Sequence, residues 1–172
     1  IPYPLFRRLS YFAATDSSLF PAQQSLEWLL IDDCWWLWSV ETTREVIRLL
    51  VTIAPQLNEQ DCITLEQAIL AGPPISMFRE ELEPALLQQA VDREIWLRLK
   101  KCSVAGMALN LDAIKKLQSL SEKYPKWQLA DDERDEFGVW MGDGEEWRQF
   151  IKTPKSSREL VNWMRIYPKS DH

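Results

Sequence analysis

Apolar residues recur along most of this chain at the three- and four-residue spacing of an α-helix, and convincing β alternation is missing. Proline or glycine follows several of these segments, where each is expected to end a helix. The pattern predicts helices over about 4–15, 21–31, 42–54 and 58–71, a short helix over 76–82, and further helices over 84–104 and 110–124. We therefore expect an all-α protein.

Individual helices show which side chains are expected to pack and where the helices begin. Leu5, Leu9, Phe12 and Ala13 form one stripe in the first helix, and an apolar stripe of this kind usually faces a core. The third helix carries an inward face of four residues, Val46, Ile47, Leu50 and Ile53. The expected N-caps are Thr42 or Thr43, Asn58 or Asp61, and Asn110.

Two pieces of the chain resemble each other at a spacing of about forty residues, the size of a HEAT-type repeat of two antiparallel helices. The matched positions are Arg8, Leu9 and Ala14 with Arg48, Leu49 and Ala54, and Leu26, Glu27 and Leu30 with Leu65, Glu66 and Ile69. We expect either stacked, HEAT-like antiparallel helix pairs or an irregular helical bundle. The expected organisation is a single domain over 1–172, with a helical-pair region over 1–74 and a second helical region over 75–172.

Three tryptophans, Trp35, Trp36 and Trp38, lie in the predicted link between the second and third helices. On a helix Trp35 and Trp38 would share a face and Trp36 would point elsewhere, so one ring must cover a second surface. The favoured interpretation is a buried plug that fills the junction between helix pairs. The alternative is an exposed aromatic patch that binds a partner, because tryptophan is enriched at binding hot spots.

Charge and cysteine content narrow the class of protein. The net charge of −6 has the wrong sign for a protein that gains affinity by neutralising phosphates, so nucleic acid is not an expected partner. Three widely spaced cysteines, without a C-x-x-C motif, are typical of buried thiols in a cytosolic protein. No apolar run approaches the roughly 18 residues of a membrane span, so we expect a soluble, cytoplasmic protein. Because the chain begins with Ile1, we also expect it to be a fragment of a larger protein.

Catalytic motifs are missing from the sequence. The single histidine is His172, and no phosphate-binding glycine motif occurs, so we expect no catalytic residue, no metal ligand and no bound cofactor. The one carboxylate cluster lies over 131–146, where Asp132, Asp135 and Glu136 would share a helix face, and a divalent-metal enzyme is an alternative on that basis.

The end of that acidic stretch is a candidate contact loop. A glycine stands on each side of Asp143, which signals a turn, and Trp140 and Trp147 flank it. Trp140, Asp143 and Trp147 therefore join the three earlier tryptophans as candidate protein-contact residues.

The segments "WWLWSVETTREVIRLLV", "LEQAILAGPP", "VDREIWLRLKK" and "LADDERDEFGVWMGDGEEW" resemble the C-terminal helical region of very large bacterial proteins. Some members of that family carry an N-terminal sirtuin-like domain and are associated with defence against phage. The resemblance implies that any NAD-cleaving chemistry lies outside this chain, and it leaves scaffolding, self-association or recognition of an invader's protein for these residues.

The leading hypothesis is a non-catalytic helical interaction, scaffold or sensor module of a larger intracellular bacterial protein. Its expected partner is another protein or another domain of the same polypeptide, and self-association to a homo-oligomer stays open. A standalone acidic inhibitor, of the antitoxin or immunity-protein type, is the alternative that docks on a basic partner.

Overall fold

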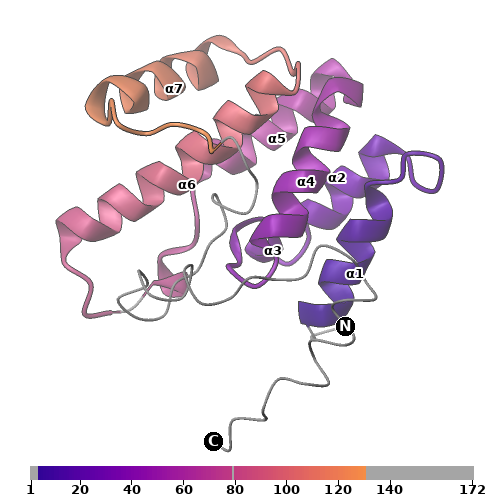
Figure 1. The fold of residues 1–172 in the computed structure, drawn as a ribbon, viewed down its shortest axis with the longest axis horizontal. Helices are drawn as coiled ribbons and strands as arrows, with labels where there is room; N and C mark the ends of the chain where they lie inside the picture. Colours follow the sequence, from indigo (N-terminus) through magenta and orange to yellow (C-terminus); the bar gives the residue numbers. More distant parts are fainter. Residues whose placement is uncertain (1–3, 79, 131–172) are drawn as a thin grey trace, which may run out of the picture. The chain divides into compact units, whose positions relative to one another are not determined.

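A computed structural model of the chain describes residues 4–78 and 80–130. Within these ranges the secondary structure is helical and includes no strand, which confirms the all-α prediction (Figure 1). The chain divides into two compact units, Ile1–Phe137 and Gly138–His172. The division expected after residue 74 lies inside the first unit, to which every helix below belongs.

The described residues form seven α-helices and two short 3-10 helices. In chain order they are α1 (Pro4–Ala14), α2 (Ala22–Leu30), α3 (Trp35–Trp38), α4 (Thr43–Ile53), η1 (Ala54–Gln56), α5 (Glu59–Ala71), η2 (Ile75–Met77), α6 (Pro84–Val104) and α7 (Leu111–Lys123). The short helix predicted over 76–82 is wrong, because only the single turn of η2 forms there. So short a segment, bounded by prolines at 74 and 84, gains too few helical hydrogen bonds to offset nucleation.

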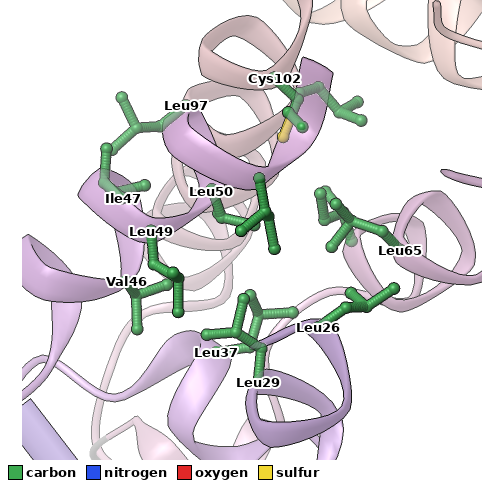
Figure 2. Packing of buried hydrophobic residues seen from close by; sticks show 14 of the residues in the cluster. Leu26, Leu29, Leu37, Val46, Ile47, Leu49, Leu50, Leu65, Leu97 and Cys102 are labelled. Atoms are coloured by element: carbon green, nitrogen blue, oxygen red, sulfur yellow. The ribbon is translucent and has the colours of Figure 1, made fainter. Parts of the chain in front are cut away.

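Helix α4 lies at the centre of this unit and contacts α1, α2, α3 and α6, while α7 lies along α6 (Figure 1). The predicted inward face of α4 is confirmed, since Val46, Ile47, Leu50 and Ile53 are all buried. Figure 2 shows side chains from α2, α3, α4, α5 and α6 meeting in one cluster, to which Leu37 and Leu65 also belong. The four-residue α3 is therefore part of the core as well as a connection.

Two of the predicted helix caps are confirmed, and the third differs. The Asn58 side chain accepts a hydrogen bond from the Asp61 backbone N–H at 2.9 Å, and the Asn110 side chain caps α7 in the same way. Thr42 stands at the N-cap of α4, but its hydroxyl donates instead to the Trp36 carbonyl at 2.9 Å. Thr42 thus ties α4 to the tryptophan turn.

The expected packing face of α1 is wrong. Leu5, Leu9 and Phe12 are 55% to 60% exposed, whereas Tyr11 and Ala14 are buried. Polar contacts select this orientation: the Tyr11 hydroxyl donates to the Trp28 carbonyl at 3.1 Å, and Arg8 donates to Glu45 of α4 at 2.9 Å and 3.1 Å. Burial raises the pKa of Tyr11 to about 12. Hydrophobic spacing alone could not show which side of α1 these contacts would turn inward.

The forty-residue repeat stays a prediction, because its matched positions lie in mixed environments. Ala14 and Ala54 are both buried, and so are Leu26 and Leu65. In contrast, Leu9 is exposed where its match Leu49 is fully buried.

The three cysteines carry free thiols. Cys102 is fully buried on the inner side of α6, and burial raises the pKa of its thiol to about 12. Cys34 and Cys62 are only partly buried, so the prediction of buried thiols holds fully for Cys102 alone. Among residues 4–78 and 80–130, no helix has the length and apolar character to cross a membrane.

Adjacent residues on α4 provide a test of the core. Leu50→Ala should lower the free energy of unfolding by about 2–5 kcal/mol, because it leaves a cavity in the cluster of Figure 2. Val51→Ala, at a position that is 40% exposed, is the matched control and should change it by less than about 1 kcal/mol. Urea denaturation followed by circular dichroism measures both, and equal losses would place the core elsewhere.

Candidate functional site

The tryptophan stretch begins with a left-handed turn. Asp32, Asp33 and Cys34 have φ angles of 56°, 53° and 61°, a conformation that costs residues with a side chain roughly 1–2 kcal/mol each. The Asp32 carboxylate helps to offset that cost, since it accepts hydrogen bonds from Trp36 Nε1 at 2.8 Å and from Arg7 of α1 at 2.9 Å. These contacts fix the direction in which α3 leaves the turn.

This turn decides which tryptophan faces solvent. Trp36 and Trp38 are 8% and 5% exposed, so both are buried in the core, while the junction between helix pairs that they were expected to fill stays a prediction. Trp35 is 38% exposed, so it is the ring of the three that reaches solvent, and it lines the recess described below together with Trp38 and without Trp36. The reason is that α3 has only four residues and its orientation comes from the turn before it.

Arg98 of α6 holds this stretch in place from the other side. Its side chain is fully buried, and its Nε and Nη2 donate to the Leu37 carbonyl at 3.0 Å and 2.7 Å. Nη1 donates to the side chain and the backbone carbonyl of Glu94. The guanidinium carbon lies 4.4 Å from the centroid of the Trp38 ring, which adds a cation–π contact.

A recess opens beside this arrangement, between α3, the residues that lead into α4, the segment around η2 and α6. Its volume is about 440 Å³, and its lining residues are Trp35, Trp38, Ser39, Val40, Glu41, Pro73, Ser76, Met77, Phe78 and Glu94. Concave sites of about 300–1,000 Å³ that are mainly apolar with a few polar groups are typical of ligand binding. We define this as the tryptophan recess.

Two carboxylates distinguish the tryptophan recess from a plain apolar hollow. Glu41 and Glu94 supply two carboxylates, and none of the described residues that line it is basic. Trp38 Nε1 is buried and has no hydrogen-bond partner in the described part of the chain. The recess therefore offers acceptors and aromatic surface, a combination suited to binding.

A second aromatic cluster fixes α7 against α6. Tyr124 stacks on Trp127 with 3.9 Å between ring centroids, and Arg93 lies 4.6 Å from the centroid of Trp96. Next to them, buried Asp92 accepts hydrogen bonds from Lys123 at 2.9 Å and from the Tyr124 hydroxyl at 3.1 Å. Burial tends to raise the pKa of Asp92, but its hydrogen bonds outweigh burial and lower it. This cluster is structural.

The remaining sequence candidates lie outside the described residues. These are Trp140, Asp143, Trp147 and the carboxylates of 131–146. Within the described ranges, no group of three or more histidine, cysteine or acidic side chains is placed to hold a metal ion.

No family model, curated protein or solved structure matches this chain. Sequence analysis pointed to Trp35 and Trp38, but it missed Arg98, Glu94 and Glu41. The sequence does contain a signal for Arg98, because this charged residue lies between Ile95 and Leu99 on the inward face of α6.

Replacing Arg98 tests whether it holds the tryptophan turn. Arg98→Met should lower the free energy of unfolding by at least about 2 kcal/mol, because the Leu37 carbonyl loses two charged donors inside the protein. Arg98→Lys should cost less, since it keeps the charge but not the paired donors. Lys115→Met, at an exposed position of α7, is the control for removing a positive charge. Urea titration of the three variants measures this, and an Arg98→Met protein as stable as the parent would refute the role.

Proposed function

We propose that this chain is a non-catalytic helical protein-interaction module, which contacts its partner through the tryptophan recess. The observation that carries the proposal is the placement of Trp35. Its ring is more than one third exposed beside the recess, while the neighbouring Trp36 and Trp38 are buried and hold the turn on which it stands.

Binding energetics support this proposal. Tryptophan is among the residues most enriched at binding hot spots, which are found in pockets shielded from water. Trp35 follows a turn anchored by Asp32 and lies on a short helix anchored by Arg98, so little backbone freedom would be lost when a partner binds. Such preorganisation converts more of the contact energy into affinity.

The exposed stripe on α1 supports an interaction role independently. Leu5, Leu9 and Phe12 together present three large apolar side chains on one helix, and contiguous exposed apolar surface of this kind often marks an interaction site. This stripe suits contact with another domain of the same polypeptide, with a second copy, or with the next pair in a HEAT-like stack.

The biological setting belongs to the same proposal. We infer a scaffold or sensor role in the bacterial cytoplasm, within a larger protein associated with phage defence. Support for this comes from the resemblance of the four helical segments quoted above and from the net charge of −6, which disfavours nucleic acid as partner.

A standalone acidic inhibitor is the second candidate. The carboxylates of Glu41 and Glu94 in the tryptophan recess favour it, because they complement a basic partner. Partner affinity that falls steeply with added salt would support this alternative over the first.

Capture of a partner by the parent chain and by single-residue variants tests the proposed function. The immobilised full chain should retain a partner from a lysate of its source cells, and Trp35→Ala should weaken that binding by about 30-fold, the effect of losing a hot spot worth about 2 kcal/mol. Leu111→Ala, an exposed apolar residue at the start of α7, is the matched control and should bind as the parent does.

Quantitative mass spectrometry and the melting temperature of each variant complete that experiment. Trp35→Ala should melt like the parent, because its ring is partly exposed. A folded Trp35→Ala protein that retains the same partner with unchanged affinity contradicts the proposal.

A further inference from the structure

We propose that the tryptophan recess binds an arginine side chain of the partner protein. This inference rests on the proposed function and adds the chemistry of the group that is recognised. It is carried by the combination of carboxylates and aromatic rings in one recess.

The charge of the recess selects a cation. Glu41 is exposed at the start of the segment that leads into α4, and Glu94 lies on α6. Arg98 donates a hydrogen bond to Oε2 of Glu94, and Oε1 of Glu94 accepts no hydrogen bond from the described part of the chain. A second guanidinium could therefore donate to Glu94 and to Glu41 without displacing Arg98.

The rings of the recess favour a flat cation over a compact one. Trp35, Trp38 and Phe78 supply aromatic surface, and guanidinium groups stack on such surfaces more readily than the strongly hydrated lysine ammonium. Within the protein itself, guanidinium groups already lie over indole rings, at 5.3 Å for Arg7 on Trp36 and 4.4 Å for Arg98 on Trp38. The recess repeats the partner set that Arg98 uses, with Trp38 and Glu94 common to both.

The size of the recess suits arginine within a peptide chain. The recess volume of about 440 Å³ leaves room for an arginine side chain and adjoining backbone.

Titration of the full chain with short blocked peptides tests this inference. The probes are acetyl-Gly-Arg-Gly-amide, the same peptide with citrulline, which has almost the same shape but no charge, and the same peptide with trimethyllysine. Binding is followed through the indole N–H resonances of Trp35 and Trp38 in ¹⁵N-labelled protein. The arginine peptide should shift both resonances, and the citrulline peptide should bind at least about tenfold more weakly.

Variants of the recess provide the matching protein controls. Trp35→Ala should weaken arginine-peptide binding about tenfold, and Glu41→Gln about threefold, since Glu41 is exposed and its charge is partly screened. Glu122→Gln removes an exposed carboxylate from α7, away from the recess, and should leave binding unchanged.

Four outcomes overturn the inference. These are no shift with the arginine peptide, equal binding of the citrulline peptide, tighter binding of a trimethyllysine peptide, and self-association that Trp35→Ala abolishes without any response to arginine. If Trp35→Ala still weakens partner capture in any of these cases, the proposed function stands and only the arginine assignment fails. If the arginine peptide binds but capture of the partner does not depend on Trp35, the arginine assignment stands and the proposed function fails.

Discussion

The buried guanidinium of Arg98 links α6 to the backbone of a tryptophan turn that lies 61 residues earlier in the chain. Its Nε and Nη2 donate to the Leu37 carbonyl, its Nη1 donates to Glu94, and the guanidinium lies over the ring of Trp38. A charge removed from water is costly unless it is fully paired, so these contacts must form together. This requirement sets the position of α3 relative to α6, and with it the shape of the tryptophan recess.

The left-handed turn over 32–34 supplies the second constraint. Its backbone is unfavourable without glycine, and it persists because Asp32 holds both Trp36 and Arg7. The turn and Arg98 together direct two indoles into the core and leave Trp35 beside the recess. Exposure of Trp35 is thus a consequence of interactions made by its neighbours.

Sequence patterning predicted the six longer helices, because their apolar residues recur at helical spacing and several end at proline or glycine, but it missed α3 and predicted a helix over 76–82 that does not form. It also predicted the inner face of α4, whose four core positions are all buried. It failed for α1, where hydrogen bonds of Tyr11 and an ion pair of Arg8 turn the apolar stripe outward. It could not show which tryptophan is exposed. The exposure of Trp35 depends on a strained turn and on Arg98, and both involve contacts between residues that are far apart in the sequence.

The exchange rate of the Arg98 Nε proton with water tests this account most directly. The ¹⁵N-resolved Nε–H signal, assigned by its loss in Arg98→Lys, should exchange at least about a hundredfold more slowly than in blocked free arginine, because the donor is buried and bonded to the Leu37 carbonyl. Exchange within a few-fold of the free amino acid, or a protected signal that survives in Arg98→Lys, would show that this guanidinium does not hold the tryptophan turn.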